Sequence, residues 1–430
     1  MATRRSVILG AGLSAMTVEG AIAAGSVNDV FDFGRVTEDL TRYAGFGLKA
    51  SGGAGDEAAG AWLAGELERL GFHTERQTIE VPFFEPRTVT LALEGGVLDG
   101  LVAQAPVKLT PAGGLTARLV RLEPWPGQPV AGAIAVARLP YARWSSARSP
   151  VVRKLLAAAA DQGAVGLVLI TEGPTGEALA LNADADEIAP FPVVTASMKQ
   201  GARLLAAAAQ GETGRLRIEG TAGRRSAYNL IGSLERGAGR RLVVSTPRSG
   251  WFDCVGERGG GIAAWLGLAR WASRECPLDL TFVSTSGHEY ENLGGHQFLK
   301  SALAPRPENT VLWAHLGAAL AARDWHEAEG RLGPLPSVDP QRFLIARPAL
   351  VETLREAFKG QAGLEAAYGD EGGAAGELGE ILAAGYGRCF GILGAHRFHH
   401  ARSDDLRCVD AAQVVATGRA LLGAVRMLAA

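Results

Sequence analysis

The sequence predicts an α/β protein with a mostly parallel sheet and helices on both faces of that sheet. Residues 241–246, 280–286 and 310–316 form apolar runs with the length and composition of buried parallel strands. Segments of helical period, such as 262–273 and 411–428, follow these runs. Parallel strands need crossover connections, which helices commonly supply, so this alternation indicates a layered α/β fold.

Length and composition limit the possible classes of protein. The chain has 430 residues, more than one ordinary domain, and 47% of them are hydrophobic. A formal net charge of −2 provides no basic footprint, so we expect no nucleic-acid partner. The four cysteines are too few and too scattered for a disulfide scaffold or a structural zinc site: Cys254, Cys276, Cys389 and Cys408.

The first 24 residues have the order of an export signal. Arg4 and Arg5 precede an apolar stretch over 7–24 that ends in small residues. This order is typical of a twin-arginine signal peptide, and the alternatives are an uncleaved anchor or a chance arginine pair. We therefore expect residues 1–24 to be removed and the mature chain to be periplasmic or secreted. No later stretch is long and uncharged enough to predict a stable membrane span.

The main domain is predicted to comprise two segments of the chain, 25–94 and 223–430. In the first segment, apolar residues recur with helical period through 59–70, and Gly71 indicates the end of that helix. An alternating strand follows from His73. The second segment carries the apolar runs of the central sheet, so the two segments together form one α/β layer structure.

Residues 95–222 form a separate unit inserted between these segments. Its predicted elements are a strand at 130–137, a helix at 149–162, a strand at 163–170 and a further strand at 191–197. The order and its glycine and proline positions resemble the protease-associated domain. Such domains usually cover or extend the substrate site of a protease. The alternative is an α/β insertion without a recognition role.

An ordered set of motifs runs through the main domain. It consists of NLIG from Asn229, LVVSTP from Leu242, GGGIAAWL from Gly259, LTFVSTSGHEYENLGG from Leu280 and FHHARSDD from Phe398. This set resembles the zinc exopeptidases of the aminopeptidase type, a group that includes carboxypeptidase Q-like and glutaminyl cyclase-like proteins. The resemblance covers most of the mature chain. It implies a site at the carboxyl ends of the strands, with two zinc ions and a glutamate general base.

The resemblance also implies where the zinc ligands would lie. The first histidine ligand falls on Pro247, and the aspartate that follows it falls on Ser249. The bridging aspartate falls on or beside Glu257, which has a longer side chain. The pair of glutamates falls on His288 and Glu289, so the ligand is kept and the general base is replaced.

The remaining ligand positions lie further along the chain. The later aspartate falls on Gly317, where only the nearby His315 offers a donor, and the last histidine ligand is His400 with Asp404 as its partner. Neither proline nor glycine has a side chain that binds a metal. An ordinary two-zinc centre is therefore not expected. If one zinc is retained, its candidate ligands are Glu257, Glu289, His315 and His400.

The first interpretation is a hydrolase of a peptide, amide or related small substrate with a remodelled active site. All eight histidines except His73 lie in the second half of the chain. We expect four residues to share one pocket: His288, Glu289, His315 and His400. The candidate catalytic residues are His288, Glu289 and His400, with Asp404 orienting His400.

Two other interpretations remain open, and four residues are candidates for substrate binding. The chain could be an inactive pseudopeptidase that binds a peptide or small ligand, or Cys254 or Ser249 could be a metal-free nucleophile. The substrate-binding candidates surround the replaced ligand positions, and their arginines could hold a substrate carboxylate: Arg248, Trp251, Phe252 and Arg258.

Overall fold

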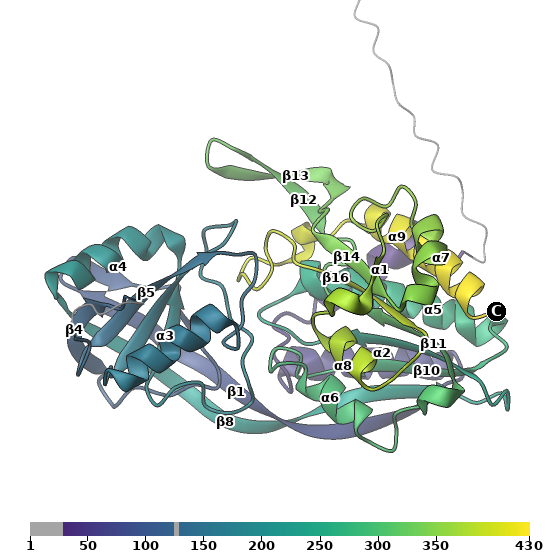
Figure 1. Ribbon diagram of the computed structural model, residues 1–430, viewed down its shortest axis with the longest axis horizontal. Coiled ribbons are helices and arrows are strands. Elements are labelled where there is room, and N and C mark those ends of the chain that lie inside the picture. Colours follow the sequence, from purple (N-terminus) through teal and green to yellow (C-terminus); the bar gives the residue numbers. More distant parts are fainter. Residues whose placement is uncertain (1–28, 124–128) are drawn as a thin grey trace, which may run out of the picture.

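The computed structural model describes residues 29–123 and 129–430 and shows two units joined by a pair of long strands (Figure 1). The larger unit contains the central sheet and most of the helices. The smaller unit contains residues of the predicted insertion. The predicted signal peptide lies outside the described residues, and within them no helix is long and apolar enough to cross a membrane.

The sheet of the larger unit has a parallel centre, which confirms the predicted fold class. Strands β10, β9, β11 and β16 pair in that order, and each pair is parallel. The flanking strands β8 and β14 pair antiparallel with β10 and β16. The bounds are β8 (Thr213–Leu234), β9 (Arg241–Pro247), β10 (Asp279–Thr285), β11 (Thr310–Leu316), β14 (Arg342–Ala346), β15 (Tyr368–Gly369) and β16 (Cys389–Gly394).

Helices cover both faces of this sheet. Helices α1, α2, α5, α7 and α9 share one core cluster with the sheet, while α6 and α8 pack on the opposite face around Phe298, Trp313 and Ile381. Their bounds are α1 (Phe33–Ala44), α2 (Ala54–Arg69), α5 (Gly260–Glu275), α6 (Leu293–Leu299), α7 (Val351–Ala357), α8 (Glu377–Ala383) and α9 (Ala411–Leu428).

Phe31 shows how closely the helices of the larger core pack. Its side chain is fully buried between α5 and α9, where both helices carry a glycine. A Cβ at either Gly267 or Gly418 would lie 2.4 Å from the Phe31 ring. The two glycines therefore provide the space for the ring, which offsets the low helix propensity of glycine.

Strands β1 (His73–Leu93) and β8 run through both units as one antiparallel ribbon. The register shifts between Pro86 and Thr88, opposite Gly220. The predicted boundaries at 94/95 and 222/223 therefore do not both fall in loops, because the second lies inside β8. The ribbon explains this, since its strands are long enough to contribute to the sheets of both units.

The sheet of the smaller unit is joined to that of the larger unit through the pairing of β4 (Leu115–Arg121) with β8, and it has its own apolar clusters on its two sides. The parallel strands β4, β5 (Ile134–Tyr141), β6 (Gly166–Glu172) and β7 (Val193–Ala196) form its centre. Its identity as a protease-associated domain stays a prediction. The remaining elements of this unit are β2 (Gly96–Leu98), β3 (Val102–Ala103), α3 (Pro150–Asp161) and α4 (Met198–Gln210).

A two-stranded hairpin projects from the larger unit beside the junction of the two units (Figure 1). It consists of β12 (Arg323–Ala328) and β13 (Arg331–Val338). The short helical turns of the larger unit are η1 (Val255–Gly259), η2 (Pro307–Asn309), η3 (Pro348–Leu350), η4 (Asp370–Gly372) and η5 (Leu406–Cys408), of which η1 is a π-helix.

Candidate active site

A cluster of polar side chains lies beyond the carboxyl ends of β9, β10 and β11, where open α/β sheets commonly bind their ligands. The strands end at Pro247, Thr285 and Leu316, and the turn η1 lies beside them. Most members of the cluster are less than 6% exposed, and the side chain of His288 is 12% exposed. We call this set the polar cluster: Glu257, Arg258, His288, His315, Glu377, His396, His399, His400 and Asp404.

An ion pair between Glu257 and Arg258 lies at the centre of the polar cluster. The Glu257 Oε1 atom is 2.6 Å from Arg258 Nη2, and both side chains are at most 1% exposed. Burial alone would raise the pKa of Glu257, but the charge of Arg258 lowers it below its usual value. Glu257 is therefore ionised at neutral pH. Both residues lie on the π-helical turn η1, an element that often marks functional sites.

His399 and His400 face the carboxylate of Glu257. The Nε2 atom of each is 3.8 Å from Glu257 Oε1, and their rings stack with centroids 4.3 Å apart. The Nδ1 atom of His400 lies 3.1 Å from the Ala180 carbonyl oxygen. Nδ1 must carry the proton to donate to that carbonyl, so Nε2 of His400 holds the free lone pair. Burial lowers the pKa of both imidazoles, so they are neutral at pH 7.

His315 and His288 lie on the other side of the polar cluster, with Glu377. Ser245 Oγ accepts a hydrogen bond from Trp313 Nε1 at 2.8 Å and lies 2.9 Å from His315 Nδ1. Donation by the serine hydroxyl to Nδ1 leaves the proton of His315 on Nε2. Burial lowers the pKa of His315 to about 4.

Glu377 is a member of the polar cluster that the sequence did not indicate. It begins α8, more than fifty residues beyond β11, in a segment without a recognisable motif. Its Oε1 atom accepts from Thr285 Oγ1 at 2.6 Å and lies 3.5 Å from His288 Nδ1. Burial raises the pKa of Glu377 and, with the charge of Arg258, lowers the pKa of His288.

Asp404 does not orient His400, contrary to the prediction. Its Oδ1 atom accepts from the Gly256 amide at 2.7 Å, and its Oδ2 atom accepts from the Glu257 amide at 3.1 Å and lies 3.2 Å from His396 Nε2. Asp404 thus fixes the start of η1 and pairs with His396. The sequence spacing between His400 and Asp404 suggested a pair, but the turn that joins them directs the two side chains to different partners.

Glu289 is also placed differently from the prediction. Its Oε1 atom accepts from the Ser51 amide at 2.8 Å and from Ser51 Oγ at 2.7 Å, and its Oε2 atom accepts from Ser249 Oγ at 2.9 Å. No ion pair within 4 Å joins Glu289 to a histidine in the described part of the chain. The structure brings His288, His315 and His400 into one cluster, whereas Glu289 accepts hydrogen bonds from the segment before α2.

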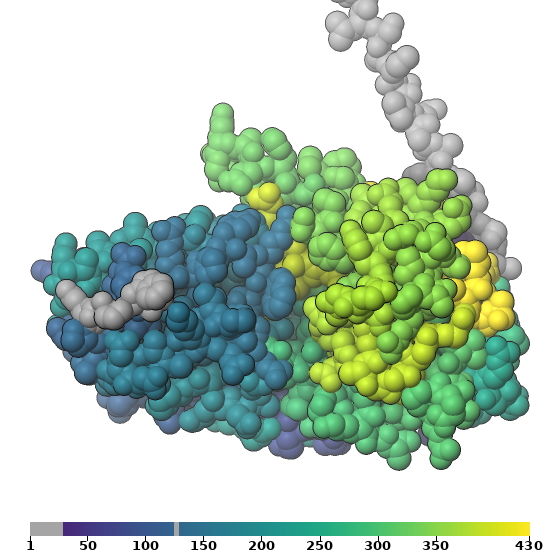
Figure 2. Space-filling model, viewed as in Figure 1, coloured from purple at the N-terminus to yellow at the C-terminus, as the bar shows by residue number. Residues whose placement is uncertain are grey.

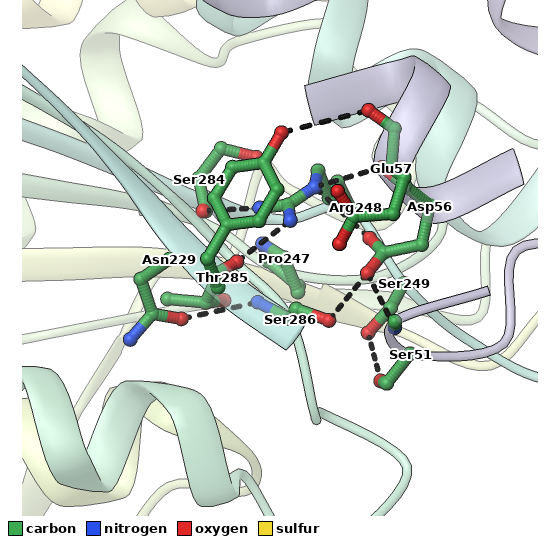
Figure 3. A network of polar contacts seen from close by, with 12 residues as sticks. Ser51, Asp56, Glu57, Asn229, Pro247, Arg248, Ser249, Ser284, Thr285 and Ser286 are labelled. Carbon is green, nitrogen blue, oxygen red and sulfur yellow. Dashed lines mark hydrogen bonds and ion pairs between the residues drawn. The ribbon is translucent and has the colours of Figure 1, made fainter. Parts of the chain in front are cut away.

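Arg248 is a structural residue, which corrects its prediction as a substrate-binding residue. Its side chain is fully buried, and Nε lies 2.9 Å from Asp56 Oδ1 (Figure 3). Nη1 donates to the Ser284 carbonyl at 2.8 Å, and Nη2 donates to the Tyr228 carbonyl at 2.6 Å. Every nitrogen of the guanidinium therefore has a protein partner, and none is left for a substrate.

Trp251 and Phe252 lie at the junction of the two units. Trp251 Nε1 donates to Asn182 Oδ1 at 2.9 Å, and both aromatic rings pack on a small apolar cluster that includes Ala178 and Ala180. These two candidates for substrate binding thus contact the smaller unit in this structure.

A loop of the smaller unit covers the polar cluster. The Ala180 amide donates to the His400 carbonyl at 3.0 Å, and the Ala183 amide donates to the Glu289 carbonyl at 3.1 Å. Figure 2 shows the two units in contact along their junction on the face in view. The side chains of the polar cluster are nearly inaccessible to solvent in this closed arrangement.

The structure gives Cys254 no features of a nucleophile. Its thiol is fully buried, 3.5 Å from Tyr43 Oη, and burial raises the pKa of Cys254 to about 12. A thiol with this pKa stays protonated at neutral pH and reacts poorly. Ser249, the other candidate nucleophile, donates its hydroxyl hydrogen to Glu289.

Two groups of side chains have the residue types that bind zinc. They are Glu257 with His399 and His400, and His396 with Asp404 and Cys408; within each group the donor atoms lie within 4.8 Å of one another. Two imidazoles and one carboxylate are a known ligand set for a catalytic zinc.

The geometry around the first group does not suit a metal. The planes of the stacked His399 and His400 rings are only 21° apart, so their lone pairs do not converge on one point. The guanidinium of Arg258 already pairs with the shared carboxylate of Glu257. Pro247 and Gly317 add no donors. The residues present therefore do not fit the two-zinc centre that the resemblance implies.

Comparisons with solved structures show the same fold in bacterial aminopeptidases. An aminopeptidase from Aneurinibacillus sp. strain AM-1 aligns with a TM-score of 0.68 and 15% identity over 94% of this chain and 95% of its own. A zinc aminopeptidase from Bacillus subtilis aligns with a TM-score of 0.69 and 14% identity over 92% of this chain and 95% of its own. An M28 peptidase precursor from Shewanella amazonensis SB2B aligns with a TM-score of 0.68 and 17% identity over 91% of both chains. No family model and no curated protein matches the sequence.

Proposed function

We propose that the protein is a peptidase-like hydrolase that cleaves a peptide, amide or related bond in a small substrate, and that the polar cluster is its reaction centre. The aminopeptidase fold supports the reaction class, because the polar cluster lies at the sheet edge where such folds bind substrates.

The observation that carries this proposal is a set of buried polar atoms that lack hydrogen-bond partners. Within residues 29–123 and 129–430, these atoms of the polar cluster have none: Glu257 Oε2, Arg258 Nη1 and Nη2, His288 Nδ1, His315 Nε2, His396 Nδ1 and His399 Nδ1. Each unpaired buried polar group costs about 1–3 kcal/mol. Apolar side chains of similar volume would avoid this cost, so we infer that a polar ligand supplies the partners.

The protonation states of two imidazoles suggest their roles. His400 presents an unprotonated Nε2, which can take a proton from a water molecule as that water attacks the substrate carbonyl. The bond between the carbonyl carbon and the leaving nitrogen then breaks, and the proton on His400 passes to that nitrogen. The guanidinium of Arg258 and the Nε2–H of His315 can donate hydrogen bonds to the oxyanion that develops.

Substrate entry requires the smaller unit to move away from the larger one. The covalent link between them is the β1–β8 ribbon, with its register shift next to Gly220. We propose that bending of this ribbon opens the junction at Ala180 and Ala183. This gives the smaller unit the covering role that is usual for a protease-associated domain.

The proposal is tested with the full mature chain on a panel of aminoacyl and peptidyl amides. We expect turnover that falls about 100-fold or more in His400→Asn, the usual effect of removing a general base. His296→Asn is the matched control, because His296 pairs with Glu380 and its side chain is 43% exposed. Turnover that is equal in the two variants would refute the role of the polar cluster.

A non-catalytic binding function is the second candidate. Pro247 and Gly317 at predicted ligand positions, together with the closed junction, favour it. Peptides that raise the melting temperature of the wild-type protein through His400-dependent binding, without forming product, would establish binding in place of hydrolysis.

We also propose that the protein is exported by the twin-arginine route. The support is the order of charge, apolar stretch and small residues within 1–24. Replacement of Arg4 and Arg5 by lysine should leave the protein in the cytoplasm of its host, as measured by cell fractionation. Export that persists unchanged in this variant would contradict the proposal.

A further inference from the structure

The guanidinium of Arg258 is an unusual feature of the polar cluster. It is fully buried, and its Nε donates to the Ser249 carbonyl at 3.1 Å. Neither Nη1 nor Nη2 makes a well-directed hydrogen bond to any residue that the structure describes, although Nη2 lies 2.6 Å from Glu257 Oε1. Buried arginines normally have a hydrogen-bond or ion-pair partner at each guanidinium nitrogen, as Arg248 does.

The charge of Arg258 acts on most of the polar cluster. It helps to keep Glu257 ionised. In addition to burial, it lowers the pKa of four imidazoles, those of His288, His315, His399 and His400. A single positive charge therefore reaches both sides of the cluster. In a two-zinc site the metal ions would provide that central positive charge.

The surroundings of Arg258 also oppose a metal. A zinc ion bound by Glu257, His399 and His400 would place a double positive charge beside the guanidinium, in a region with almost no solvent to screen the repulsion. The carboxylate of Glu257 already pairs with Arg258, so the same carboxylate would have to compensate the ion as well.

We propose that Arg258 is the resident cation of this site, that it supplies the positive charge which zinc ions supply in aminopeptidases, and that it prevents zinc from binding to Glu257, His399 and His400. This inference rests on the proposed reaction centre and deepens it, but its test needs no substrate.

The donors that Arg258 blocks should bind zinc once the arginine is removed. In Arg258→Met the chain keeps a side chain of similar length without the charge, and Glu257, His399 and His400 become free to rotate toward one ion. Three protein ligands and a water molecule complete a tetrahedral zinc site. Arg258→Lys keeps the charge and should continue to exclude zinc.

The experiment measures zinc content by mass spectrometry, after equilibration with zinc and removal of the free ion, and the zinc-induced shift in melting temperature. We expect about one zinc per chain and a raised melting temperature in Arg258→Met, with neither effect in the wild type or Arg258→Lys. The double variant Arg258→Met/His400→Asn should lose the gained zinc. Arg342→Met, which removes another buried arginine away from the polar cluster, should gain none.

Two results would overturn the inference. One is a wild-type protein that binds zinc and loses it in His400→Asn. The other is a folded Arg258→Met protein, judged by circular dichroism, that takes up no more zinc than Arg342→Met. If Arg258→Met does not fold, zinc binding by the wild type and Arg258→Lys decides the question. Turnover in a zinc-bound wild type would refute this inference but leave the proposed function intact. A zinc-free protein without turnover would refute the proposed function but leave this inference intact.

Discussion

The ion pair between Glu257 and Arg258 gives a stability prediction that can be worked out from the structure. With 2.6 Å between the two atoms and an effective dielectric constant of about 20, the attraction is about 6 kcal/mol before the cost of desolvation. Glu257→Gln removes the negative charge and leaves the buried guanidinium without a counter-ion. Breaking a buried pair in this way costs about 3–5 kcal/mol. We therefore expect Glu257→Gln to lower the free energy of unfolding by about that amount.

The assay is urea-induced unfolding followed by tryptophan fluorescence, with a chelator present throughout. Of the eight tryptophans, only Trp125 and Trp144 lie within the predicted insertion, so the signal reports mainly on the larger unit. The double variant Glu257→Gln/Arg258→Met should be more stable than the sum of the two single effects predicts, with a coupling energy of about 0.5–3 kcal/mol. Glu380→Gln, at a partly exposed pair, should cost less than about 1 kcal/mol. Additive single effects would refute the central ion pair.

Three further predictions follow from the buried groups. Asp56→Asn should destabilise the protein by about 3–5 kcal/mol in the same urea assay, because it leaves the buried Arg248 without its counter-ion. The folded variant should keep the wild-type KM for its substrate, and a changed KM would show that Arg248 contributes to substrate binding. Burial lowers the pKa of His315 to about 4 in the folded state, against about 6.5 in the unfolded state, so His315 should contribute about 3 kcal/mol to the loss of stability as the pH drops from 6.5 towards 4. His315→Gln should reduce that loss by about this amount, and an unchanged profile would contradict the lowered pKa. Native Cys254 should resist iodoacetamide at pH 8 and react only after unfolding, as mass mapping of the labelled peptide would show; rapid native labelling would contradict its burial.

Much of the fold could be predicted from the sequence, because buried parallel strands leave a clear apolar signal. The strand predicted at 310–316 matches β11, and the helix predicted at 411–428 matches α9. The full length of β1 and β8 could not be predicted, because the central part of β8 is largely exposed and polar and the central part of β1 contains Pro82 and Pro86, and both features indicate loops. Only their pairing with each other shows that they continue as strands.

The candidate site was predictable in its members more than in their pairings. Motif positions indicated Glu257, Arg258 and His400, which the structure brings together. The partners of Asp404 and Glu289 could not be inferred, since side-chain direction after a strand depends on turns that spacing does not define. Glu377 enters the cluster from a distant segment, and only tertiary packing places it there.

The central claim is that Arg258, and not a pair of zinc ions, provides the positive charge of the site. Diffraction at the zinc absorption edge, from crystals of the wild-type protein equilibrated with zinc, tests this claim most directly. We predict electron density for the guanidinium beside Glu257 and no anomalous peak within the polar cluster. Two anomalous peaks about 3.5–4 Å apart next to Glu257, the separation usual for paired catalytic metals, would contradict the claim.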